Sequence, residues 1–424
     1  MAIGEILRGL LGIGAFIAIA WVVSERRRAF PMRPVVVGLI SQIVVALVLT
    51  KVPAVIAFFQ IIARAVDRVQ ASSAAGARFV FGYLSGGPQP FAPADSVAST
   101  VIFAFQALPA VLLVSALAAL LWHWKILRWF VTVAAWVFGR LFKVSGPVGV
   151  STSACIFIGM IEAPMLIRPT LSRLSRGEIF IIMVDGMSVL AGSMMILLGA
   201  LLANRMPNAF SHLLTAALIS TPMAIGLARA IVPSDDALNQ PVALENHYRS
   251  SLDAITQGTL VALRMAATIA ALVIVFCGLV ALIDEILTVL PHHGAPLTLR
   301  AIFGDLLVPV AWLMGVPGAD LHTVGSLLGT KLALNEIIAY GQLASLDPGA
   351  LSEKGTLIVT YALASFGNIG SVAILIGTLT VMAPDKSVEV VQLGFKALLA
   401  STLTTCLTGT LVGLLTAIPA WKPL

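Results

Sequence analysis

Hydrophobic residues occur along the chain in long runs, and short polar stretches mark where each run ends. The apolar runs cover residues 4–24, 34–50, 98–122, 127–142, 178–204, 209–232, 258–290, 356–382 and 394–418. A run of about 20 apolar residues can cross the hydrocarbon core of a bilayer as a helix. The pattern therefore predicts an all-α polytopic membrane protein surrounded by lipid.

Other segments interrupt this series. Residues 54–72 have apolar positions at helical spacing interrupted by charges, which favours an interfacial helix over a span. The stretch "SGGPQPFAPADS" is typical of a loop. The longest polar stretch begins at Val232, and we interpret it as a linker between two halves. The predicted organisation is N-terminal helices in 1–97, a first half in 98–232, the linker in 233–257 and a second half in 258–424.

Each half also contains an apolar region that glycine, proline and one glutamate interrupt. These regions cover about 145–176, with Glu162, and about 305–346, with Glu336. Each precedes a span with a polar, glycine-rich centre: "VDGMSVLAGSMMILLG" after the first and "SFGNIGSVAILIG" after the second. Corresponding broken segments in two halves indicate a transport site at a repeat interface.

The charges that follow the two broken regions differ. Arg168, Arg173 and Arg176 follow the first, whereas the residues after the second have no basic excess. Basic residues gather on the cytoplasmic side of membrane proteins. The two regions are therefore expected to enter from opposite faces, as an inverted repeat requires.

Composition supports the membrane assignment. The chain is 59% hydrophobic, 11% charged and has a net charge of +6, whereas soluble domains are about 25% charged. We read the basic excess as a signal for orientation and not for nucleic-acid binding. The basic segment "ERRRAFPMR" after the first span predicts an N-terminus outside the cytoplasmic membrane. Three scattered cysteines indicate no disulfide framework and no metal site, and we expect no cofactor.

Inserting a carboxylate at the bilayer centre costs about 2.5–3.5 kcal/mol, so a binding or a structural role is expected for Glu162 and Glu336. The alternative to a binding role is a structural hydrogen bond to a neighbouring helix. Asn368 and Ser371 lie three residues apart on one helix face and suit either a polyhydroxy ligand or contacts between helices. Asp185 suits cation coupling or pairing with an arginine.

Two basic residues leave similar alternatives. Lys331 either pairs with Glu336 or caps the second broken region. Arg264 lies early in its span and is expected to extend its charge toward the interface.

Several ordered motifs resemble the concentrative nucleoside transporter family over nearly the whole chain. They are "GMIEAPMLIRP", "RLSRGEIFIIMVDGMSVLAGS", "WLMGVP", "GTKLALNEIIAY", "TYALASFGNIGSVAILIG" and "APDKSVEVVQLGFKALLASTLTTCLTG". The resemblance implies an inverted-repeat transporter with two re-entrant hairpins and two broken helices, usually a homotrimer. It also implies symport of nucleosides with sodium or protons, and no enzymatic activity.

The resemblance assigns roles to single residues. Glu336, Asn368 and Ser371 would bind the ribose hydroxyls, Glu162 would face the nucleobase, and Phe366 would pack near sugar or base. The predicted substrate site comprises Gly159, Met160, Ile161, Glu162, Asn335, Glu336, Phe366, Asn368 and Ser371.

The sequence departs from the family pattern at the base side. Met160 and Ile161 stand where the family usually has Gln and Thr or Ser, and their side chains cannot hydrogen-bond a base edge in the same way. Base preference is therefore expected to be relaxed or shifted. A transporter of the same fold for another substrate, such as a nucleobase, a modified nucleoside or another ribosylated compound, is the alternative.

A second departure concerns the coupling ion. Cys155 replaces an asparagine usual in sodium-coupled members, and a thiol is a poor ligand for a hard cation. The predicted coupling residues are Cys155, Ile158, Asp185 and Ser188. We favour proton coupling through Asp185 or Glu162 over sodium coupling, in which Asp185 and Ser188 would rebuild the ion site. A membrane enzyme or a sensor is a third alternative, for which the sequence offers no catalytic constellation.

Overall fold

The computed structural model describes residues 2–88, 90, 102–106, 108–203, 205–234, 248–289, 291–292 and 295–416. Within these residues the fold is helical, apart from one two-stranded antiparallel ladder of β1 (Pro291–His292) and β2 (Ala295–Pro296). Seven helical segments of the described chain are long and apolar enough to cross a membrane. The expectation of an all-α polytopic protein is confirmed.

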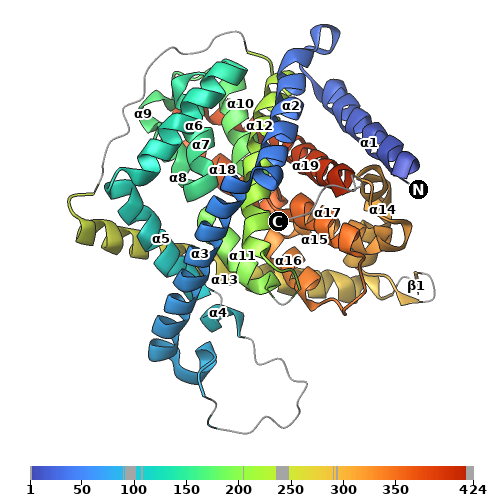
Figure 1. Cartoon of the computed structure of the whole chain (residues 1–424). Helices are drawn as coiled ribbons and strands as arrows, with labels where there is room; N and C mark the ends of the chain where they lie inside the picture. Colours follow the sequence, from blue (N-terminus) through green and yellow to red (C-terminus); the bar gives the residue numbers. More distant parts are fainter. Residues whose placement is uncertain are drawn as a thin grey trace.

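The N-terminal part contains six α-helices, and most agree with the predicted runs. They are α1 (Ala2–Val23), α2 (Met32–Lys51), α3 (Pro53–Phe81), α4 (Phe103–Gln106), α5 (Leu108–His123) and α6 (Ile126–Phe142). Two short 3-10 turns, η1 (Arg27–Ala29) and η2 (Gly82–Ser85), join them. Helix α3 is longer than the predicted interfacial segment, and its place at the interface stays a prediction. Figure 1 shows α2 beside α12 (Ala209–Ile231), against which it packs through the middle of the molecule.

The next part contains the first broken region. Its helices are α7 (Gly146–Ile158), α8 (Glu162–Met165), α9 (Arg168–Leu171), α10 (Arg176–Ser188) and α11 (Gly192–Leu202), followed by α12. The remaining elements are α13 (Ser251–Leu287), α14 (Leu299–Leu313), η3 (Gly318–Asp320), α15 (Leu321–Ala333), α16 (Glu336–Ser345), α17 (Glu353–Leu363), α18 (Ile369–Met382), η4 (Pro384–Lys386) and α19 (Ser387–Thr416).

Two predicted spans are broken helices, in agreement with the fold that the family resemblance implies. The apolar run 178–204 is divided into α10 and α11, and the run 356–382 into α17 and α18. Each break falls in the polar, glycine-rich centre of its span, although the flanking residues are apolar enough for hydropathy to predict one continuous run. The sequences "GSMMILLG" in α11 and "GSVAILIG" in α18 stand in the same place after each break, as an internal repeat requires.

The predicted linker is wrong at its C-terminal end. Helix α13 already begins at Ser251, because the side chain of Ser250 accepts the backbone N–H of Asp253 at 3.1 Å and caps the first turn. Residues 235–247 of the linker lie outside the described residues, as do residues 98–101 of the predicted third span. The division into two halves therefore stays a prediction.

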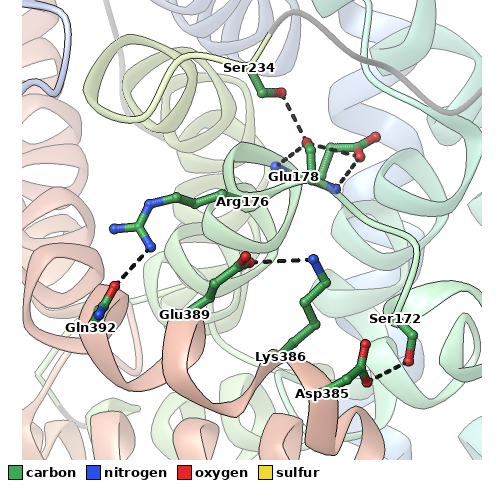
Figure 2. A network of polar contacts seen from close by, with 9 residues as sticks. Ser172, Arg176, Glu178, Ser234, Asp385, Lys386, Glu389 and Gln392 are labelled. Atoms are coloured by element: carbon green, nitrogen blue, oxygen red, sulfur yellow. Dashed lines mark hydrogen bonds and ion pairs between the residues drawn. The ribbon is translucent and has the colours of Figure 1, made fainter.

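Polar contacts connect α10 with α19, two helices that come from opposite parts of the sequence. Arg176 of α10 donates to Gln392 of α19 at 3.3 Å, and Ser172, which follows α9, donates to Asp385 of η4, just before α19, at 2.8 Å (Figure 2). At the start of α10, Ser175 and Glu178 form a capping box. These contacts fix the ends of two helices that pack along their length and enclose the core.

Candidate functional site

The first broken region places a glutamate directly after a sharp turn. Helix α7 ends at Gly159, whose φ of 101° is accessible mainly to glycine. Glu162 is the first residue of α8, and one of its carboxylate oxygens lies 3.3 Å from the place where a Gly159 Cβ would be. The turn therefore brings Met160, Ile161 and Glu162 to the end of α7.

The second broken region repeats this arrangement. Helix α15 ends at Ala333, and Asn335 caps α16 by accepting the backbone N–H of Ile338 at 2.9 Å. Glu336 is the first residue of α16 and is buried. Both predicted glutamates therefore begin the second arm of a helix–break–helix unit, which the sequence had suggested only by their place in each half.

Asn368 links the second unit to the broken helix α17–α18. Its side-chain oxygen caps α18 by accepting the N–H of Ser371 at 2.8 Å. That bond turns its side-chain nitrogen toward Glu336, to which it donates at 3.0 Å. Both residues are about 4% exposed. The cap thus orients a paired donor and acceptor at a buried site.

The two broken helices meet at their breaks. The backbone N–H of Phe366, between α17 and α18, donates to the carbonyl of Val189, between α10 and α11, at 3.4 Å. A Cβ on Gly367 would lie 3.3 Å from the carbonyl oxygen of Met187. Backbone freed from helical bonding in one half is therefore partly satisfied by the other half, as buried irregular backbone requires.

These elements surround a cavity of about 420 Å³, a volume usual for a small-molecule site. All nine predicted substrate-site residues line it: Gly159, Met160, Ile161, Glu162, Asn335, Glu336, Phe366, Asn368 and Ser371. The residues of the first half, 159–162, and those of the second half, 335–371, are separated by more than 150 positions in the sequence. The larger hollow beside Arg205 and Lys354 contains none of them.

Sequence reasoning missed the wall of the cavity that α13 provides. Arg264, Met265 and Thr268 line it, together with apolar residues on the same helix face. We had expected Arg264 to extend toward the interface, whereas the structure places it at the cavity. The available signal was its isolation, because no other charged residue lies between Asp253 and Asp284.

The predicted coupling residues separate into two groups. Ile158 lines the cavity, whereas Cys155, Asp185 and Ser188 are buried outside its lining. Cys155 lies near the carboxyl groups of Asp185 and Glu162. The hydroxyl of Ser188 donates to the carbonyl of Val184 at 2.7 Å, so it remains within its own helix.

Asp185 lies fully buried beside Thr221, without a salt bridge. Neither of its carboxylate oxygens has a hydrogen-bond partner among the described residues. The Thr221 hydroxyl donates instead to the carbonyl of Ala217 at 3.2 Å. An unpaired ionised carboxylate in such a place costs several kcal/mol, so the neutral acid is favoured. The alternative that Asp185 pairs with an arginine is wrong within the part of the chain that the structure describes.

Lys331 has a different role from the two that the sequence left open. Its ammonium donates to the carbonyl of Ala362 at 2.9 Å and to the hydroxyl of Thr405 at 3.4 Å. It lies near Glu336 but forms no ion pair with it within the described structure. Lys331 therefore connects α15 to α17 and α19 behind the cavity.

Comparison with known proteins agrees with this architecture. Residues 11–84 match the N-terminal profile of the Na+ dependent nucleoside transporters, and residues 212–413 match the C-terminal profile. The Nucleoside permease NupC of Helicobacter pylori is 32% identical, covering 96% of this chain and 97% of the relative. The chain belongs to the concentrative nucleoside transporter family.

Other relatives of the family align just as fully. The Putative nucleoside permease NupX of Escherichia coli is 31% identical over 96% of this chain and 98% of the relative. The Uncharacterized transporter YutK of Bacillus subtilis is 32% identical over 97% and 99%. Membership of a transporter family confirms the expectation that this protein is not an enzyme.

Solved structures of the family show the same fold. CNTnw in an inward-facing substrate-bound state superposes with a TM-score of 0.86 at 29% identity, covering 96% of this chain and 98% of that chain. A variant of CNTnw in an outward-facing state gives a TM-score of 0.89 at 28% identity, with 99% of both chains covered. The protein is thus a multi-pass membrane transporter of this fold.

Proposed function

We propose that this protein is a secondary active symporter that imports nucleosides across the cytoplasmic membrane, driven by a proton gradient. The observation that carries the proposal is the capped Asn368 that donates to Glu336 in a cavity shared by both broken regions. The Glu336 carboxylate can accept from the hydroxyls of a vicinal diol, and the second N–H of the Asn368 amide, whose oxygen already accepts from Ser371, can donate to one of them. The names of NupC and NupX support the same substrate class.

The units α7–α8 and α15–α16 serve as re-entrant hairpins in this proposal. Non-helical backbone at mid-membrane depth is tolerated where it lines a cavity, and both turns line this one. Alternating access would then move the two breaks relative to the exposed wall of α13. The N-terminus lies outside, three subunits assemble, and each subunit carries its own cavity.

Asp185 supports the choice of protons as the coupling ion. A buried carboxyl group without a partner is stable when protonated and must find a cation or water when it ionises. Cys155, close to Asp185, offers no oxygen to a sodium ion. The proton therefore enters at Asp185 while the substrate occupies the neighbouring cavity.

A second candidate function is transport of a related compound by the same fold. Met160 and Ile161 line the cavity where hydrogen-bonding side chains would read a base. Because a site without these hydrogen bonds discriminates only weakly among bases, the substrate of this candidate is a nucleobase, a modified nucleoside or another ribosylated compound.

Counterflow exchange in proteoliposomes tests the substrate class and separates the two candidates. Labelled uridine, adenosine and guanosine are exchanged against unlabelled nucleosides, free nucleobases and ribose. Exchange with nucleosides, lost in Glu336→Gln, supports the proposal. Exchange with nucleobases alone would establish the second candidate.

A further inference from the structure

Arg264 and Thr268 form a polar strip on the cavity-lining face of α13, where the other lining residues are apolar. They lie four residues apart, and both line the cavity from α13. In the sequence, Arg264 is the only charged residue between Asp253 and Asp284. A single charge inside an apolar span is costly and usually marks a ligand or ion pathway.

The donors on this strip have no partner in the described structure. Arg264 makes no hydrogen bond or ion pair there, and the hydroxyl of Thr268 makes no hydrogen bond. Two other threonines of α13 behave differently, because Thr256 and Thr259 donate to the carbonyls four residues earlier at 2.9 and 2.8 Å. The strip is thus available to whatever occupies the cavity.

Most other polar groups of the cavity are engaged or are acceptors; the exceptions in the described structure are the amide nitrogen of Asn335 and the hydroxyl of Ser371, which the proposed function assigns to the ribose. Asn335 uses its side-chain oxygen to cap α16, and Asn368 uses both ends of its amide. Glu162 and Glu336 accept hydrogen bonds when ionised. The guanidinium of Arg264, with several N–H donors in one plane and no acceptor, is therefore the main donor that a base edge would meet.

We propose that Arg264, assisted by Thr268, reads the base, and that the preferred substrates are 6-oxopurine nucleosides such as inosine and guanosine. This rests on the proposed nucleoside function. The O6 and N7 atoms of a 6-oxopurine base are adjacent acceptors that match two parallel N–H groups of a guanidinium. Adenine presents an amino donor in place of O6, and 7-deaza bases lack N7. The strip thus replaces the donors that Met160 and Ile161 do not supply.

The test measures ligand affinities of the purified protein from concentration-dependent thermal shifts. The ligands are inosine, adenosine, 7-deazainosine and inosine 5′-phosphate. We expect inosine to bind about 5- to 150-fold more tightly than adenosine, the discrimination usual for a bidentate pair. The affinity of 7-deazainosine should be lower than that of inosine and close to that of adenosine. This comparison needs no substitution, so it remains decisive where a variant fails to fold.

Variants then assign the preference to Arg264. In Arg264→Met the ratio of inosine to adenosine affinity should approach one, because inosine loses the contacts to both O6 and N7 whereas adenosine loses at most the contact to N7. Arg264→Lys keeps the charge but loses the planar pair of donors, so most of the preference should also be lost. Arg300→Met is the matched control, because Arg300 lies outside the cavity and donates to Ser326.

Four results would overturn the inference. An unchanged ratio in Arg264→Met, or no preference in the wild type, would show that the strip does not read the base. Tighter binding of inosine 5′-phosphate than of inosine would make Arg264 a phosphate site. If no nucleoside shifts the melting temperature, the proposed function fails as well, which distinguishes that outcome from a loss of preference alone.

Discussion

Asn368 donates from its side-chain nitrogen to Glu336 at 3.0 Å while its side-chain oxygen holds the N–H of Ser371. One amide thus starts helix α18 and aligns the carboxylate at the start of α16. Because the two helices belong to separate units, any movement of one relative to the other changes this pair. In the proposed function, substrate recognition and the arrangement of the two units would be coupled through this pair.

Glu336→Gln should weaken nucleoside binding by about 10- to 150-fold, because a hydrogen bond to a charged group contributes about 1.5–3 kcal/mol. The isosteric amide retains the packing, so the melting temperature of the unliganded protein should change little. Counterflow exchange and thermal shifts measure the two effects. Wild-type affinity in the variant would show that Glu336 does not contact the substrate.

Asn368→Ala should abolish uptake and also lower the free energy of unfolding by about 1 kcal/mol through the lost cap. Thr298→Ala is the matched control, because Thr298 caps α14 by accepting from Ala301 at 3.1 Å and lies outside the cavity. The control should lose similar stability but retain uptake. Equal loss of uptake in both variants would reduce the role of Asn368 to that of a cap.

Gly159→Ala should reduce uptake strongly and destabilise the fold by about 1–3 kcal/mol, because its φ of 101° is strained for any side chain. The new Cβ would also lie 3.1 Å from that of Ala191. Gly14→Ala serves as the comparison, since Gly14 lies in α1 with nothing within 4 Å and a negative φ. That change should be neutral or stabilising by about 0.5–1 kcal/mol. A stable, active Gly159→Ala protein would contradict the turn geometry.

Asp185→Asn should retain counterflow exchange but lose accumulation against a gradient. The amide cannot exchange a proton, and it removes the cost of ionising a buried group. Ser193→Ala, a polar truncation in neighbouring α11 outside the cavity lining, should leave accumulation unchanged. Proton-driven accumulation by Asp185→Asn would move the coupling role to Glu162.

Glu25 provides a pH-dependent contact between three segments. Partial burial opposes its ionisation, but hydrogen bonds from Lys396 at 2.8 Å and Arg176 at 3.2 Å hold its pKa below the ordinary value. Because the pKa of Glu25 is lower in the folded protein than in the unfolded chain, where it is about 4.3, its ionised form stabilises the fold at higher pH. This stabilisation is lost as the pH falls through the folded-state pKa. The melting temperature of Glu25→Gln should therefore be lower than wild type at pH 7 and converge with it below about pH 4. A difference independent of pH would contradict this contact.

Much of the site could be predicted from the sequence because its polar residues stand alone in apolar surroundings. Glu162, Glu336 and Asn368 were visible for that reason. Gly159 and Pro164 marked the break beside Glu162, whereas no glycine or proline lies within four residues of Glu336. Hydropathy alone did not reveal the breaks between α10 and α11 and between α17 and α18, because each lies within one long apolar run; only the family resemblance implied two broken helices. Arg264 was identified in the sequence, but its side chain was predicted to extend toward the interface and not to line the cavity. Local spacing does not reveal which face of α13 packs toward the cavity.

Gradient-driven uptake tests the central claim most directly. Proteoliposomes containing the wild-type protein are given an inward proton gradient, an inward sodium gradient or neither, and labelled inosine, uridine and adenosine are followed over time. Accumulation above equilibrium with the proton gradient alone is the predicted result. Accumulation only with the sodium gradient would contradict the role given to Asp185, and no accumulation under either gradient would contradict nucleoside symport itself.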